Sequence, residues 1–243
     1  MNYRKCLDDA VLLVEEANLE LSIIEELYFS SIKKTEIDNR LLIKIKGTFE
    51  HLRSSLDFVA QGIALKYDLK NKRNIYFPYA RLGVDRETFV NEKRIEKSLP
   101  GLEKIRPDIV KFIMDMQHFS HEGAKWFPEF MELNNKNKHV HLVPQGLSKA
   151  VSLEFNGNQI LAHGITIGES GSIKTKNGTL KGPLEITTEN VNEFDGSGIF
   201  EAKAWEAIYI KGYGFPMNTF EFVRHCVCAI STVVKQFKSM LLP

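Results

Sequence analysis

Residues 37–67, IDNRLLIKIKGTFEHLRSSLDFVAQGIALKY, contain the strongest structural signal of the chain. Its large apolar residues recur at alternating steps of three and four, at Leu42, Ile45, Phe49, Leu52, Leu56, Val59 and Ile63. This heptad spacing keeps one face of a helix apolar over several turns, while the charged residues between them stay near solvent. The spacing predicts a long helix that packs within a bundle.

Further helices are expected on both sides of this stretch. A similar but less regular stripe before it predicts a first helix with an acidic exterior. The periodicity lapses over residues 70–99, where Pro78 indicates a long connection with a short helix at 86–97. It returns over 102–118 and again from Trp126, and these stretches predict a third and a fourth helix. Pro107 fits best in the first turn of the third helix proper.

Residues 151–214 follow a different pattern. They form short alternating segments, interrupted by the dipeptides Asn156-Gly157 and Asn177-Gly178. Such dipeptides supply the positive φ angles of tight hairpin turns. This part of the chain therefore predicts several antiparallel strands.

A last helix is expected to begin near Asn218, whose side chain could cap it together with Glu221. Because an isolated amphipathic helix is unstable in water, this helix should return to pack on the N-terminal helices. The predicted fold class is α+β: an antiparallel bundle of about five helices with a small antiparallel sheet inserted before the C-terminal helix. We expect one compact unit made of a helical bundle (1–148), a β-rich insertion (149–215) and the C-terminal helix (216–243).

Composition restricts the function classes. The chain of 243 residues has 32 basic and 31 acidic residues, so no overall electric field attracts nucleic acid or a membrane. Any such binding must be local.

The three cysteines of the chain suit a reducing compartment, and the sequence shows neither the apolar core of a signal peptide nor a membrane span. We expect a cytoplasmic protein. No Gly-rich phosphate loop is present, and no cofactor is expected.

Polar residues crowd the segment 134–141, NNKNKHVH, where the apolar stripe of the fourth helix ought to continue. On a helix, Asn134, Lys138 and His141 share one face, and His139 lies on another. Amide, ammonium and imidazole groups together can hold an anion such as phosphate. The alternative is a solvated helix end, with basic residues near the C-terminal carbonyls as the helix dipole prefers.

Three motifs in this chain resemble those of a group of uncharacterised bacterial proteins. The group has a Leu-Arg-Ser-(Ala/Ser)-Leu-Asp helix, a Phe-Pro turn and an Asn-x-x-(Asp/Asn)-Lys-His element. The corresponding residues here are Leu52, Arg53, Ser54, Ser55, Leu56 and Asp57; Phe77 and Pro78; and Asn134, Asn137, Lys138 and His139. The helical portion of that group is similar to the HEPN superfamily, which includes RNA-cleaving toxins and antiphage factors. The resemblance implies a HEPN-like bundle that binds RNA or another phosphate-bearing ligand, in a bacterial defence setting.

The sequence departs from the catalytic pattern of that superfamily. HEPN nucleases carry an Arg a few residues before a His, so that a cation stabilises the transition state while the imidazole moves a proton. Here Asn134 stands where the Arg is required, and an amide cannot supply its charge. We therefore expect a binding or assembly role. If the chain is an enzyme, it should be ribonuclease-like.

Arg53 and Asp57 lie one turn apart on the second helix. They can form a structural ion pair, which contributes only about 0.3–0.5 kcal/mol when exposed. They can also face the polar segment across the bundle, with Asp57 orienting His139 and Arg53 completing an anion site. The binding candidates are therefore Arg53, Asp57, Asn134, Lys138, His139 and His141.

Two further function classes remain open. His118 and His121 could join His139 and His141 in the zinc site of a metal-dependent hydrolase, with Glu122 or Glu132 as the available carboxylate. The chain could also be a non-catalytic protein–protein module that forms a homodimer through an exposed face of the bundle.

Overall fold

The computed structural model of the chain describes residues 2–34, 36–69, 75–139, strands β1 to β7 between 145 and 210, and residues 218–242. Side chains are described for 2–34, 36–69, 75–137, 208 and 218–242. The contacts of the chain form two compact units. Unit 1 comprises Met1–Tyr28, Asp38–Val143 and Phe220–Pro243, and unit 2 comprises Phe29–Ile37 and Pro144–Thr219. The expected division at 148 and 215, and the expectation of one compact unit, stay predictions.

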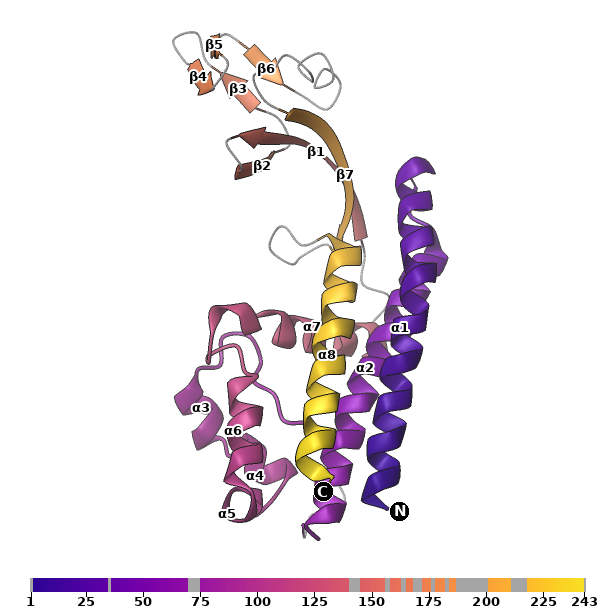
Figure 1. Ribbon diagram of the computed structural model, residues 1–243, viewed down its shortest axis with the longest axis vertical. Coiled ribbons are helices and arrows are strands. Elements are labelled where there is room, and N and C mark those ends of the chain that lie inside the picture. The colour runs from indigo at the N-terminus through magenta and orange to yellow at the C-terminus, as the bar shows by residue number, and fades with distance from the viewer. Residues whose placement is uncertain are drawn as a thin grey trace. The chain divides into compact units, whose positions relative to one another are not determined.

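Three long helices run side by side in unit 1 (Figure 1), namely α1 (Tyr3–Lys34), α2 (Asn39–Lys66) and α8 (Thr219–Leu241). The predicted return of the C-terminal helix to the N-terminal helices is confirmed, because Lys238 Nζ of α8 lies 2.9 Å from Asp8 Oδ1 of α1. The C-terminal ends of α2 and α8 also meet, where Lys66 donates to the carbonyl of Leu241. The helical bundle that the sequence predicts is therefore present. No described helix has the length and apolarity that a membrane span requires.

The predicted apolar stripe of α2 is buried, with one shift at its start. From Ile45 to Ile63 all six expected positions have side chains that are at most 3% exposed. At the first position, however, Leu41 is buried and Leu42 is only half-buried. A straight helix has about 3.6 residues per turn and drifts against a strict heptad. Leu41, four residues before Ile45, therefore lies closer to the middle of the buried face.

Short helices follow α2, and they outnumber those predicted. They are α3 (Arg86–Asn91), α4 (Arg94–Ser98), α5 (Leu102–Ile105), α6 (Pro107–Asp115), a 3-10 turn (Glu122–Ala124) and α7 (Trp126–His139). The single helix expected over 86–97 is divided at Lys93, whose φ of 53° is left-handed. The helix expected over 102–118 is divided at Arg106, because Pro107 disfavours helical geometry in the residue before it and takes the first position of α6.

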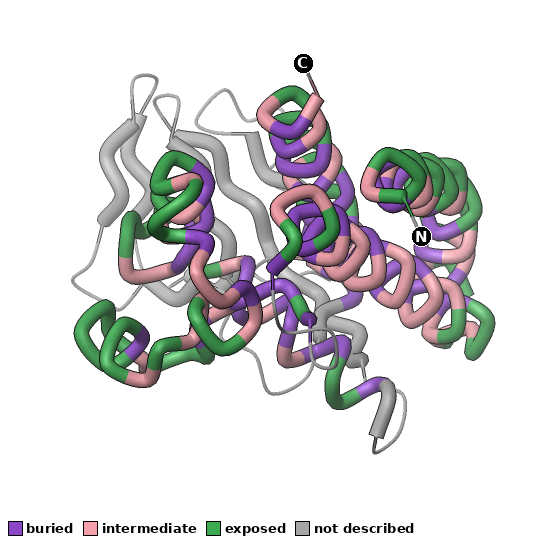
Figure 2. The backbone as a smooth tube through the Cα atoms, turned by 90° about the horizontal axis from the view of Figure 1, so that it is seen from below, coloured by how far each residue is buried: buried purple, intermediate pink, exposed green. Residues whose placement is uncertain are grey.

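Aromatic rings join the elements of unit 1. Phe49 of α2 packs edge-on against Phe130 of α7 and Phe222 of α8, with ring centroids 5.4 and 6.0 Å apart. In the connection after α2, the ring centroid of Phe77 lies 5.7 Å from that of Phe237 of α8. Figure 2 shows buried residues concentrated where these helices meet. The connection after α2 is therefore part of the core of unit 1. The residues next to Phe77 in this connection lie near the contact between α2 and α7.

Antiparallel strands lie in the part of the chain where the sequence alternates. A three-stranded sheet has the order β2-β1-β7, formed by β1 (Gln145–Phe155), β2 (Asn158–Ala162) and β7 (Glu201–Ile210). In its register, Gln145 pairs with Ile210 and Phe155 with Asn158. Two further pairs join β3 (Ile165–Ile167) to β6 (Leu184–Ile186) and β4 (Ser172–Thr175) to β5 (Gly178–Lys181). The expected turn residues Asn156, Gly157 and Asn177 lie outside the described residues.

Candidate functional site

The first two motifs of the sequence are in contact, and the helix that carries the third, α7, packs against α2. We call this place the motif junction and define it by Arg53, Asp57, Tyr79, Asn134 and Asn135. Arg53 and Asp57 lie on α2, Tyr79 lies in the connection that follows it, and the two asparagines lie on α7. The structure thus brings together residues that are far apart in the sequence.

Asp57 holds the connection after α2 in place. Its Oδ1 accepts the backbone N–H of Phe77 at 2.8 Å and lies 3.0 Å from Arg53 Nη2. The predicted ion pair between Arg53 and Asp57 is therefore confirmed. The expected contact between Asp57 and His139 stays a prediction, because the side chain of His139 is outside the described part of the chain.

Arg53 lies between apolar heptad positions, where a charged side chain is expected near solvent, but its side chain is only 11% exposed. Its Nη1 donates to Met131 Sδ of α7 at 3.1 Å, and its Cζ lies 5.5 Å from the centre of the Tyr79 ring. A planar guanidinium suits such a position, because its edge donates hydrogen bonds while its face packs on an aromatic ring. Asp57 opposes its charge, so Arg53 first serves to join α2, α7 and the connection.

Tyr79 contacts two polar side chains of the junction, Asn135 and Arg53. Its hydroxyl accepts from Asn135 Nδ2 at 3.0 Å, while its ring covers the guanidinium of Arg53. Reasoning from the sequence missed Tyr79 as a site residue. The signal was its position directly after the Phe77-Pro78 motif.

Gln117 fixes the other side of the same connection, and it too was missed. It is fully buried, and its Oε1 accepts the backbone N–H of Ala80 at 2.8 Å. Its Nε2 donates to the carbonyl of Ile113 at 2.8 Å. Gln117 follows the end of α6 and belongs to no motif, so no pattern in the sequence indicated its role.

Asn134 is the unusual residue of the junction. Its side chain is fully buried, and within the described part of the chain neither Nδ2 nor Oδ1 has a hydrogen-bond partner. Leaving a buried amide unpaired costs about 1–3 kcal/mol. Asn134 is therefore not part of a solvated helix end. Lys136, two residues further on, is exposed, and its Nζ lies 2.9 Å from Glu132 Oε1.

The remaining binding candidates continue α7 beyond the described side chains. Lys138 and His139 are the last two residues of this helix, and His141 lies outside the described residues. Position 138 follows Asn134 by one helical turn. The expected face shared by Asn134, Lys138 and His141 stays a prediction.

Two histidines of the metal alternative can be located. His121 is exposed, whereas His118 is half-buried and its Nδ1 is buried without a hydrogen-bond partner among the described residues. Burial lowers the pKa of His118. Among the described residues, no group of three His, Cys, Asp or Glu side chains is placed to hold a metal. The contribution of His139 and His141 to such a site stays a prediction.

The chain matches no family model, no curated protein and no solved structure. Fold and junction together define a helical-bundle protein with a buried polar contact between α2 and α7. We therefore infer the function from the residues of the motif junction.

Proposed function

We propose that the chain is a HEPN-like protein that binds RNA through its phosphate groups at the motif junction, with Lys138 and His139 completing the site. The observation that carries this proposal is the buried amide of Asn134, which has no partner in the described part of the chain. Buried polar groups in folded proteins are nearly always paired, so an unpaired one calls for an explanation. A phosphate oxygen that accepts from Nδ2 would supply the missing partner, provided that binding displaces the residues that cover this amide.

The charges of the junction determine how a phosphate would be held. Arg53 is opposed by Asp57, and Lys136 is paired with Glu132. The C-terminal end of a helix also carries partial negative charge, which opposes an anion by about 0.3–1 kcal/mol. Lys138, and His139 when protonated, must therefore supply the net attraction. Only one or two phosphates are then neutralised, so binding to single-stranded RNA should weaken with salt at a log–log slope of about −1.

Binding without cleavage fits the arrangement of Arg53. A catalytic cation must reach the phosphate in the transition state. The guanidinium is held between Asp57, Met131 and the Tyr79 ring instead. We therefore propose a binding protein, in which Arg53 positions α7 and the polar end of that helix contacts the ligand.

Fluorescence anisotropy with a labelled single-stranded RNA of about 16 nucleotides, at the upper end of ordinary site sizes, tests the proposal. The decisive variant is Asn134→Leu. Exchange of a buried amide for an apolar group of similar shape is nearly neutral or stabilising when the amide has no partner. The variant should therefore unfold at the same or a higher urea concentration. Its RNA affinity should fall by about tenfold, which corresponds to the loss of one hydrogen bond to a charged group.

Lys138→Gln and Lys136→Gln form a matched pair, because each removes one positive charge from the same segment. The Lys138 variant should weaken binding and reduce the salt slope by about 0.7. The Lys136 variant should have a much smaller effect, since Glu132 already neutralises Lys136. Equal losses, or wild-type affinity in Asn134→Leu, would contradict the proposal. Complete competition by inorganic pyrophosphate would show that a small phosphate compound occupies the site instead of RNA.

A further inference from the structure

The outer side of α1 carries large apolar residues where solvent-facing polar residues are expected. Leu12, Leu19 and Ile23 are 60%, 67% and 43% exposed, and they are spaced by seven and four residues. This spacing places them on one helix face. The opposite face, which includes Ala17 and Ile24, is fully buried. We call Leu12, Leu19 and Ile23 the α1 ridge.

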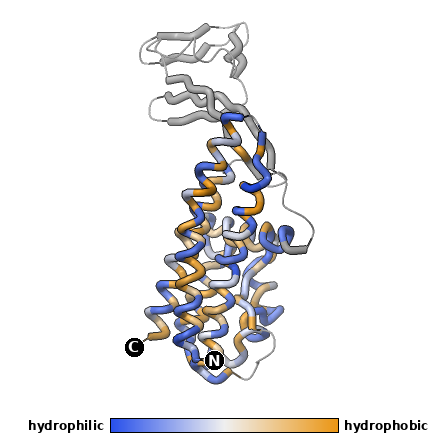
Figure 3. Tube along the Cα trace, turned by 90° about the vertical axis from the view of Figure 1, so that its right-hand side faces the viewer, coloured by the Kyte–Doolittle hydropathy of each residue, from blue (hydrophilic) through white to orange (hydrophobic). Residues whose placement is uncertain are grey.

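A groove lies on each side of this ridge. The groove between α1 and α8 has a volume of about 490 Å³, and Val14, Leu19 and Val234 supply apolar lining. The groove between α1 and α2 has a volume of about 330 Å³, where Ile23 meets Ile43 of α2. Ile43 is itself 58% exposed. Figure 3 views the bundle from the side on which α1 lies and shows hydrophobic positions interspersed with hydrophilic ones. Apolar surface therefore extends from the ridge into both grooves.

The charges around the ridge are predominantly negative. Two exposed acids beside the ridge, Glu15 and Glu16, form no ion pair within the described part of the chain, and a third, Glu26, interacts electrostatically with Arg40. Two bases of the neighbouring helix are already engaged, since Lys44 pairs with Glu20 and Arg40 pairs with Asp38. The ridge thus combines exposed apolar side chains with an excess of acids over bases, although Lys235 of α8 lines the first groove beside Glu15.

We propose that the α1 ridge binds a basic amphipathic helix of a partner protein. Such a helix would lay its apolar stripe along Leu12, Leu19 and Ile23, and its Lys or Arg residues would meet the acids of α1. Charge disfavours a second copy of this chain as the occupant, because two antiparallel α1 helices would place Glu15 and Glu16 against acids of the same kind. This inference is independent of the motif junction, since no ridge residue belongs to it.

A synthetic peptide of about 18 residues, or five helical turns, tests the proposal with the full chain. The peptide carries leucines on one helical stripe and lysines on both sides of it, and a second peptide carries glutamates in place of the lysines. Anisotropy should show 1:1 binding of the basic peptide alone, which weakens as salt rises.

Leu19→Asp is the sharpest variant. It adds a negative charge that would attract the basic peptide more strongly, so a loss of affinity can come only from the lost apolar contact. We expect weakening of about tenfold or more. Val90→Asp is the matched control, because Val90 is 55% exposed on α3 and lies off the ridge. The double change Glu15→Lys and Glu16→Lys should also weaken binding and reverse the preference between the two peptides.

Sedimentation of the protein without peptide tests whether a second copy of the chain occupies the ridge. A dimer that Leu19→Asp dissociates would show that a second copy occupies the ridge, and it would overturn the proposal. Equal binding of the basic and acidic peptides, or unchanged affinity in Leu19→Asp, would overturn it as well.

Discussion

Asp57 of α2 accepts the backbone N–H of Phe77 at 2.8 Å, and this bond fixes the connection that carries Tyr79. The same carboxylate balances the largely covered Arg53. Asp57→Ala should therefore lower the free energy of unfolding by about 2–3 kcal/mol, because it removes a hydrogen bond to a charged group and leaves a partly buried cation unpaired. Urea unfolding measures the change.

Asp115→Ala is the control for that variant, because it breaks an ion pair of the same spacing on the surface. Lys111 and Asp115 are 76% and 56% exposed, so their pair should contribute at most about 0.5 kcal/mol. A loss in Asp57→Ala as small as that in Asp115→Ala would show that Asp57 does not anchor the connection.

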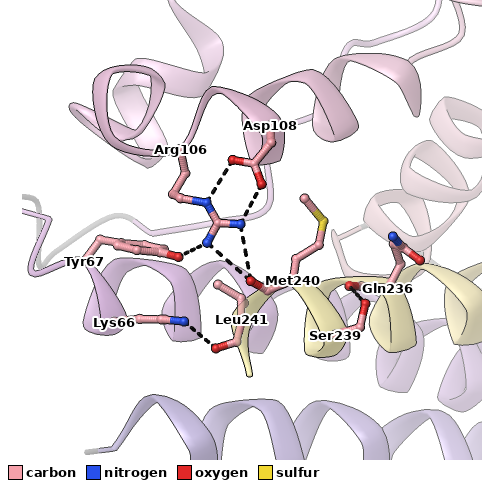
Figure 4. A network of polar contacts seen from close by, with 8 residues as sticks. All are labelled: Lys66, Tyr67, Arg106, Asp108, Gln236, Ser239, Met240 and Leu241. Atoms are coloured by element: carbon pink, nitrogen blue, oxygen red, sulfur yellow. Dashed lines mark hydrogen bonds and ion pairs between the residues drawn. The ribbon is translucent and has the colours of Figure 1, made fainter. Parts of the chain in front are cut away.

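Arg106 connects three parts of unit 1 (Figure 4). It donates to the hydroxyl of Tyr67 after α2, to Asp108 of α6 and to the carbonyl of Met240 near the end of α8. The last carbonyls of a helix lack partners within the helix, and a cation there is favourable. Arg106→Ala should lower the free energy of unfolding by about 1–3 kcal/mol. Thermal unfolding with Arg224→Ala for comparison tests this, because Arg224 is 57% exposed and, among the described residues, its ion pair is with Glu221 of its own helix.

His118 should make stability depend on pH. Burial lowers its pKa in the folded state, so the unfolded chain binds the proton more readily. Its contribution is fully present above the ordinary histidine pKa of about 6.5 and is lost as the pH falls from there through the lowered pKa. Urea unfolding between about pH 7 and pH 5 should therefore show a smaller loss of stability on acidification for His118→Gln than for the wild type. His121→Gln, at an exposed position, is the control for the exchange of one histidine.

The three cysteines should differ in reactivity. Cys228 is exposed, whereas Cys6 and Cys226 are fully buried. Burial raises the pKa of both buried thiols, and thiolate is the reactive form. A chromogenic disulfide reagent should therefore modify Cys228 rapidly in the folded protein and the other two only on unfolding. Rapid modification in Cys228→Ser would contradict the packing around α1 and α8.

The sequence predicted the helices wherever apolar spacing persists. The buried stripe of α2 and the return of α8 to α1 follow from the spacing of apolar residues, because a helix with one apolar face must bury that face. Pro107 indicated the start of α6, whereas the break at Lys93 was missed, since it depends on the backbone conformation of a single residue inside a periodic stretch. Local signals of this kind are weak beside the overall pattern.

Sequence motifs predicted the residues of a candidate site, and contacts in the folded chain assigned roles to several of them. Motif spacing selected Arg53, Asp57 and Asn134, but only packing shows that Arg53 is covered and that Asn134 is buried. The exposed ridge on α1 likewise appears only in the fold, because a periodic pattern cannot tell which apolar residues find a neighbour. Burial and pairing arise from contacts between distant segments, whereas periodicity reports the backbone of one segment at a time.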